Sequence, residues 1–154
     1  MSLDELDVKI LSALSQDGRV KWSALAEQFG ISAPAIADRV RRLENANVIT
    51  GYAARLNAEK LGIDLTAFIS VTLDHPRYRQ GFVAYVEAAD NIQSCHHIVG
   101  EGDYLLQVRC QSTADLERLL SDEIKSLPGI AQTRTTIALS TVKDSQSLPL
   151  SALV

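Results

Sequence analysis

The stretch that decides the fold is Trp22–Asn45, WSALAEQFGISAPAIADRVRRLEN. It has the spacing that two crossed helices need. The small Ala26 allows the helices to approach closely, and Gly30, four residues later, can adopt the left-handed conformation of a tight turn. Ile31 and Ile36 supply aliphatic side chains that fill the crossing. The stretch therefore predicts a helix-turn-helix motif.

The second helix of this motif has an apolar and a polar face. Ser32 can cap it, and on a 100°-per-residue wheel its inner face is Ile36, Val40 and Leu43. The residues predicted to point outward, with Arg39 on the flank, are Pro34, Asp38, Arg41 and Arg42. Arginines placed in this way can reach phosphates or guanine edges in a major groove. Backbone N–H groups of the first turn can also meet a phosphate.

We therefore predict a DNA-binding surface on this motif. The predicted contact residues are Lys21, Trp22, Ser32, Ala33, Pro34, Ala35, Asp38, Arg39, Arg41 and Arg42. The alternative is that the three arginines are only the solvated face of a packed helix. The spacing of the turn residues favours DNA binding, as do Lys21 and Trp22 at the start of the motif. Asp38 would repel phosphates, unless it accepts from a cytosine amino group or pairs with Arg41 or Arg42.

The hydrophobic periodicity divides the chain into two parts. Residues 1–50 predict three helices, the first from about Asp4 to before Gly18 and the second capped by Ser23. Residues 51–63 predict a linker, and the composition of residues 48–56 suggests a strand leading into it. Residues 64–144 predict an α+β domain, and residues 145–154 a loosely held tail. Within the second domain we expect strands at 66–73, 92–99, 105–110 and 130–142 and helices at 78–89 and 113–127.

This β-α-β-β-α-β order predicts a ferredoxin-like sandwich with an antiparallel sheet. Its helices cover one face of the sheet only, which leaves the other face available to a partner.

Charge is segregated along the chain, whose formal net charge is −4. Residues 18–62 carry three more basic than acidic groups, and the residues from 63 onward carry four more acidic than basic groups. A mildly basic first part and an acidic second part suggest two different tasks. No apolar run approaches the roughly 20 residues of a membrane span, and Met1–Asp7 lacks the apolar segment of a signal peptide. We therefore expect a cytoplasmic protein.

Two cysteines are too few for a disulfide framework. A β-hairpin turning at 101–104 would place Cys95 opposite Cys110, with His97 on the same face and His96 beside them. The usual metal-site spacing is missing, and Val99, Leu106 and Val108 would share that face. We therefore expect core packing, and neither a metal nor a cofactor.

Several runs resemble the leucine-responsive/asparagine-responsive (Lrp/AsnC) family of feast/famine regulators. They are Leu6-Asp7 with Ile10-Leu11, Asp17-Gly18-Arg19, Ile31–Glu44, Val48–Tyr52, Leu61-Gly62, Gly100–Tyr104 and Ser147–Leu150. The resemblance implies a winged or extended helix-turn-helix, a strand-bearing linker and a ferredoxin-like regulation domain. It implies homodimers that assemble into tetramers or octamers and bend or wrap double-stranded DNA. Asp38 departs from the pattern, in which a basic residue is common at this position.

The resemblance also implies a small-molecule effector, an amino acid or a related metabolite, bound between dimers near residues 100–104. Gly100 and Gly102 can expose N–H groups to a carboxylate, Glu101 or Asp103 could accept from an ammonium group, and Tyr104 could form a wall. Weaker candidates for the effector site are Thr135 and Thr136. The alternative for this loop is a plain hairpin turn.

The predicted function is a sequence-specific transcriptional regulator whose assembly or DNA affinity responds to an amino acid. Two other functions compete with it. An enzyme is disfavoured, because no nucleophile, base and orienting group stand at a recognisable spacing and an active site would not explain the helix-turn-helix. The second is an amino-acid-sensing oligomer with little DNA binding of its own, as Asp38 could suggest.

Overall fold

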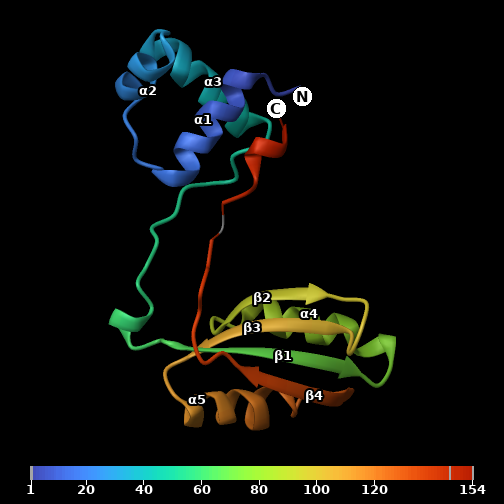
Figure 1. Cartoon of the computed structure of the whole chain (residues 1–154). Coiled ribbons are helices and arrows are strands. Elements are labelled where there is room, and N and C mark those ends of the chain that lie inside the picture. Colours follow the sequence, from blue (N-terminus) through green and yellow to red (C-terminus); the bar gives the residue numbers. More distant parts are fainter. Residues whose placement is uncertain (1, 146, 154) are drawn as a thin grey trace. The chain divides into compact units, whose positions relative to one another are not determined.

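The computed structural model describes residues 2–145 and 147–153, which form two compact units. Residues 2–55 belong to the first unit together with the described residues after 142, and residues 56–142 form the second. Figure 1 shows that the first unit is helical and that the second is a sheet with its helices. In the part of the chain that the structure describes, no helix is both long and apolar enough to cross a membrane.

The first unit is built from α1 (Glu5–Gln16), α2 (Trp22–Phe29) and α3 (Ala33–Asn45). A reciprocal cap starts α1: the Asp4 carboxylate accepts from the Asp7 N–H, and the Asp7 carboxylate accepts from the Asp4 N–H. The predicted inner face of α3 is confirmed, because Ile36 and Leu43 are fully buried and Val40 is 2% exposed. Ile36 and Val40 belong to a core that also includes Ile10, Leu14, Leu25 and Ala26.

Two local predictions for this part of the chain were wrong. The cap of α2 is Lys21 rather than Ser23, because the Lys21 carbonyl already accepts from the N–H groups of Ala24 and Leu25. No strand is found among residues 46–64, where a single 3₁₀ turn, Glu59–Leu61, interrupts irregular backbone. A strand needs a hydrogen-bonded neighbour, and no strand in the described part of the chain pairs with this segment. The end of the chain includes a helical turn, η4 (Leu150–Leu153), that contacts α1.

The second unit is a four-stranded antiparallel sheet. Its strands are β1 (Leu65–Leu73), β2 (Ile92–His97), β3 (Tyr104–Cys110) and β4 (Ile130–Ile137), in the order β2-β3-β1-β4. The helix α4 (Arg79–Ala88) joins β1 to β2, after a 3₁₀ turn at Pro76–Tyr78. The helix α5 (Thr113–Arg118) joins β3 to β4 and continues as a π-helical turn, Leu119–Ile124. The predicted βαββαβ sandwich is confirmed.

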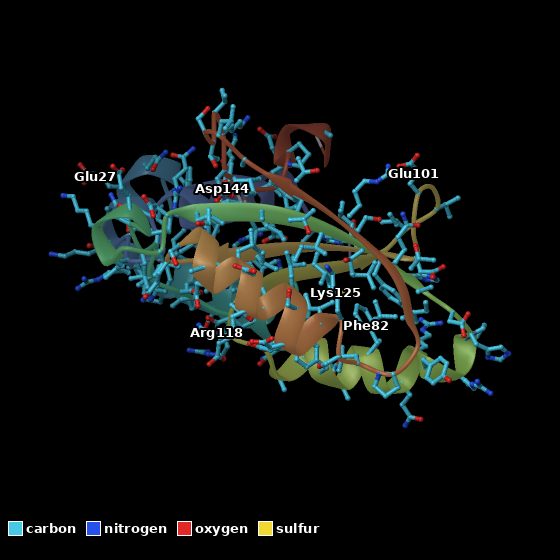
Figure 2. The ribbon with its side chains drawn as sticks, turned by 90° about the horizontal axis from the view of Figure 1, so that it is seen from below. Glu27, Phe82, Glu101, Arg118, Lys125 and Asp144 are labelled. Atoms are coloured by element: carbon cyan, nitrogen blue, oxygen red, sulfur yellow. The ribbon has the colours of Figure 1, made fainter. Side chains whose placement is uncertain are left out.

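The two faces of the sheet differ in composition. Alternate residues of β1 and β3 pack against Phe82, Leu116, Leu119 and Ile124 of the helices and form the core. On the opposite face Phe68, 37% exposed, pairs with Thr136 of β4 and Gln107 of β3. Figure 2 shows α4 and α5 together on one side of the sheet, as predicted.

The predicted pairing of the two cysteines was wrong. Cys95 of β2 lies opposite Leu106, and Cys110 of β3 lies opposite Leu65, so the two thiols are on different strand pairs. The strand register is shifted from the expected one because the β2–β3 connection is longer than the predicted turn and begins at residue 98. Both thiols lie on the helical side, and burial raises the pKa of each. Val99 is fully exposed rather than part of the core.

Candidate functional site

The turn between α2 and α3 has the geometry of a helix-turn-helix. Gly30 ends α2 in the left-handed conformation, with φ of 68°. The Ile31 N–H then donates to the Ala26 carbonyl at 3.1 Å, which folds the chain back over α2. The Ser32 hydroxyl caps α3 by accepting from the Ala35 N–H at 3.3 Å. These contacts fix where the first turn of α3 begins.

The residues predicted to contact DNA divide by exposure. The exposed ones are Lys21, Ser32, Pro34, Asp38, Arg41 and Arg42. The partly buried ones are Trp22, Ala33, Ala35 and Arg39. Trp22 and Ala33 pack against the core of the unit, so each offers only part of its surface. The start of α2 and the first turns of α3 thus present mainly small and polar groups to solvent.

The three arginines of α3 have different partners. Arg41 pairs with Asp38, one turn away, at 2.9 Å, and both side chains are highly exposed. Arg39 instead reaches Asp4 at 2.6 Å and Asp7 at 2.8 Å, and Arg42 donates to both carboxylate oxygens of Asp7 at 2.9 Å. Arg41 and Arg42 are exposed and Arg39 is partly buried, but the guanidinium groups of Arg39 and Arg42 turn toward α1.

Asp7 is the residue at this site that the sequence did not reveal. Its side chain is 1% exposed, yet it accepts from both Arg39 and Arg42. The Asp4 and Asp7 carboxylates raise the pKa of the Arg39 guanidinium, and Arg39 in turn lowers the pKa of Asp4. The only available signal was an acidic residue between the apolar Leu6 and Val8 in a first helical turn, where acids are common anyway.

The second predicted site, residues 100–104, comprises most of the loop 98–103 and the first residue of β3, and the loop is held tightly against β1. The Asp103 N–H donates to the Val71 carbonyl at 2.9 Å, and the Leu73 N–H donates to the Asp103 carboxylate at 2.7 Å. Gly102 has φ of 93°, and a Cβ atom there would stand 2.4 Å from the Ser70 hydroxyl. The loop therefore needs glycine at position 102. The Asp103 side chain accepts a hydrogen bond from the backbone of β1.

A small polar cavity lies where this loop meets β1 and β4. Its volume is about 30 Å³, and its lining is Ser70, Thr72, Glu101, Gly102, Gln132 and Arg134. The Ser70 hydroxyl donates to the Glu101 carbonyl at 2.7 Å, and the Glu101 carboxylate forms an ion pair with Arg134. Figure 2 shows Glu101 at the end of the sheet, away from α4 and α5. The sequence pointed to the loop but missed the residues from β1 and β4.

The three remaining predicted effector residues do not share one side of the sheet. The ring of Tyr104 is buried and contacts Phe82 and His97, with centroid distances of 4.8 Å and 5.0 Å, so it does not form a wall for the loop. Thr135 lies opposite Ile69 on the helical side, and Thr136 lies opposite Phe68 on the open side. Alternate strand residues point to opposite faces, so the two threonines do not share a site.

A larger hollow of about 420 Å³ lies between α4 and α5. None of the predicted site residues lines it. Its main polar side chains pair with one another: the Tyr85 hydroxyl donates to Glu123 at 2.8 Å, and Arg118 pairs with Asp115. Burial and this hydrogen bond raise the pKa of Tyr85.

Comparison with known proteins connects both parts of the chain to one family. Residues 3–44 match the AsnC-type helix-turn-helix domain, and residues 66–148 match the Lrp/AsnC ligand binding domain. The leucine-responsive regulatory protein of Haemophilus influenzae is 36% identical over 97% of this chain and 91% of its own.

Two solved structures are similar over nearly the whole chain. A transcriptional regulator of Neisseria meningitidis in complex with L-methionine has a TM-score of 0.95 and 32% identity, covering 99% of both chains. A feast or famine regulatory protein of M. tuberculosis complexed with L-methionine has a TM-score of 0.87 and 37% identity, covering 95% of this chain and 98% of its own. The family consists of transcriptional regulators, not enzymes. The chain belongs to the Lrp/AsnC family and is a DNA-binding transcriptional regulator with a helix-turn-helix and a ligand-binding domain.

Proposed function

We propose that α3 enters a DNA major groove with its first turns, and that an amino acid bound at the 98–103 loop alters the assembly that presents α3. The observation that supports the first part best is the turn: Gly30 and Ser32 set the start of α3, and Lys21, Pro34 and Arg41 are exposed beside it. The proposed contacts with DNA are Lys21, Trp22, Ser32, Ala33, Pro34, Ala35, Asp38 and Arg41, with Arg41 as the principal charged group of α3. The protein acts in the cytoplasm, where its DNA target is accessible.

Arg41 is available to DNA because its partner is easily exchanged. Exposed ion pairs contribute only about 0–1 kcal/mol, so a phosphate or guanine edge can replace Asp38. Asp38 then lowers the net positive charge of α3 but does not prevent Arg41 from binding DNA. This arrangement gives Asp38 a role compatible with DNA binding and argues against the protein being only a sensor.

Arg41→Gln should lower affinity for a duplex selected by the wild-type protein from a random-sequence pool about tenfold, since a good arginine–guanine contact contributes about 1–3 kcal/mol. Fluorescence anisotropy at fixed salt measures this. Arg118→Gln is the matched control, because Arg118 forms the same i,i+3 pair with Asp115 on α5. Equal affinity of the two variants would contradict the proposed contact.

For the effector we propose an amino acid whose carboxylate pairs with Arg134. The two methionine complexes among similar proteins support this class of ligand. The cavity of about 30 Å³ has the volume of one water molecule, so a whole amino acid needs the Glu101 side chain to leave Arg134 or needs additional walls. A second copy of the chain could supply those walls.

Arg134→Gln should weaken binding of L-methionine, or of whichever of the twenty amino acids raises the melting temperature most, about 10- to 100-fold. The reason is the loss of a charge-assisted hydrogen bond. Glu101→Gln should have the opposite effect, because it releases Arg134. Calorimetric titration measures both, and Arg118→Gln again serves as the control. Unchanged affinity in the Arg134 variant would exclude this residue from the site.

We further propose that the protein works as a homodimer that assembles into tetramers or octamers. The open face of the sheet, with the half-exposed Phe68 at its centre, supports a sheet-to-sheet contact. In such a dimer two α3 helices would read half-sites about 34 Å apart, one turn of DNA. An effector between dimers would then change DNA affinity through linkage with assembly.

A further inference from the structure

The charge of the first unit is balanced, although this unit carries the helix-turn-helix. Residues 1–55 and 143–154 contain eight Lys or Arg and eight Asp or Glu. Attraction to the DNA backbone comes from basic groups that neutralise phosphates and release counterions. Which arginines of α3 are free to do so therefore decides how strongly this unit binds any duplex, whatever its sequence.

The arginines of α3 are held by carboxylates of two kinds. The Asp38 carboxylate, which holds Arg41, is 73% exposed, so water and phosphate compete for the guanidinium directly. The Asp7 carboxylate, which holds Arg39 and Arg42, is 1% exposed. If either guanidinium left for a phosphate, the buried Asp7 carboxylate would lose one of the two positive charges that offset the cost of its desolvation. A buried charge without its partner is strongly disfavoured.

The position of Asp7 is itself fixed by the fold. Its backbone N–H donates to Asp4 at 2.8 Å in the cap of α1, and α1 is anchored in the core by the fully buried Ile10. Asp4 adds a second carboxylate to Arg39 at 2.6 Å. The two guanidinium groups are therefore tied to the start of α1 by three hydrogen bonds to Asp7 and one to Asp4.

We propose that Asp7 is a specificity-determining residue of the DNA-binding unit. It withholds the charges of Arg39 and Arg42 from duplex phosphates, so that sequence-independent attraction stays weak and contacts to base edges decide where the protein binds. The inference rests on the proposed docking of α3, and it replaces the expected phosphate contacts of Arg39 and Arg42 with a role inside the protein.

The test is the salt dependence of binding to a random-sequence duplex and to the selected duplex. Each phosphate neutralised adds about 0.9 to the slope of log K against log salt. Asp7→Asn should make the slope on the random duplex steeper by about 1 to 2, since it frees at least one positive charge. The ratio of selected to random affinity should fall about tenfold at low salt.

The matched control is Glu5→Gln. It changes the net charge by the same amount in the same helix, but Glu5 is exposed and pairs with Lys9 of α1 rather than with α3. Its slope should equal that of the wild type. A purely structural role of Asp7 would weaken binding to both duplexes with no steeper slope, and that result would overturn the proposal. Trp22 fluorescence during thermal melting shows whether each variant is folded at the assay temperature.

A second comparison leaves Asp7 in place, and it decides the question if the Asp7 variant does not fold. Arg42→Gln should leave the slope on the random duplex unchanged, whereas Arg41→Gln should make it shallower by about 0.9. A decrease for Arg42→Gln as large as that for Arg41→Gln would overturn the role of Asp7 but leave the docking of α3 intact. Failure of the wild-type protein to bind any duplex would overturn both.

Discussion

Ile36→Asp should unfold the helix-turn-helix and abolish binding to every duplex. Ile36 is fully buried at the crossing of α2 and α3, in contact with the core of the first unit. A carboxylate there would have no partner, and burying such a group costs about 4 kcal/mol or more, a large part of the stability of a small domain. Circular dichroism during thermal melting would show the loss of the helical signal, and anisotropy would show the loss of binding.

The control for this substitution is Ile36→Val. It removes one methylene from the same position and should cost about 0.5–1.5 kcal/mol, with DNA binding retained at low temperature. The second unit has its own core, so its sheet signal should persist in the Asp variant. An Ile36→Asp protein that still binds the selected duplex with wild-type affinity would show that α3 is not packed as described.

Gly102→Ala should remove the response to an amino-acid effector while leaving DNA binding intact. The new Cβ atom would meet the Ser70 hydroxyl at 2.4 Å and the Val71 carbonyl at 3.2 Å, in a backbone conformation with φ of 93°. A residue other than glycine in such a conformation costs about 1–3 kcal/mol, and the contact with Ser70 adds to this. The loop must therefore shift away from β1 and take Glu101 with it.

Gly81→Ala provides the matched control in the same unit. Gly81 lies in α4, where an added Cβ would meet nothing within 4 Å, so the substitution should slightly stabilise the helix. Both variants should be titrated with L-methionine and the other amino acids while the melting temperature is followed. If Gly102→Ala responds as the control does, the 98–103 loop is not the effector site.

The elements were predictable from the sequence because hydrophobic periodicity, caps and glycine turns agreed with one another. In α3, for instance, the Ser32 cap and the buried Ile36, Val40 and Leu43 were visible in the sequence. The order of strands and helices likewise predicted the sandwich. The prediction of a strand near the linker was wrong because a strand depends on a neighbouring strand, which local composition does not reveal.

The candidate sites were predictable in part only, because pairing between distant residues decides what each charge does. A helical wheel places Arg42 outward but cannot show that it reaches Asp7, 35 residues earlier in the chain. In the same way the loop sequence indicated glycine and acid residues, but the pairing of Glu101 with Arg134 depends on the sheet. Tyr104 was misplaced because the alternation of β3 turns it into the core.

Hydrogen–deuterium exchange of the full chain, free and bound to the selected duplex, tests most directly whether α3 is the DNA-reading element. The account predicts that binding protects backbone amides in residues 21–42, most strongly at the turn after Gly30 and in the first turns of α3, and leaves 113–124 unchanged. Protection confined to residues 56–142, with exchange in 21–42 the same in both states, would contradict it.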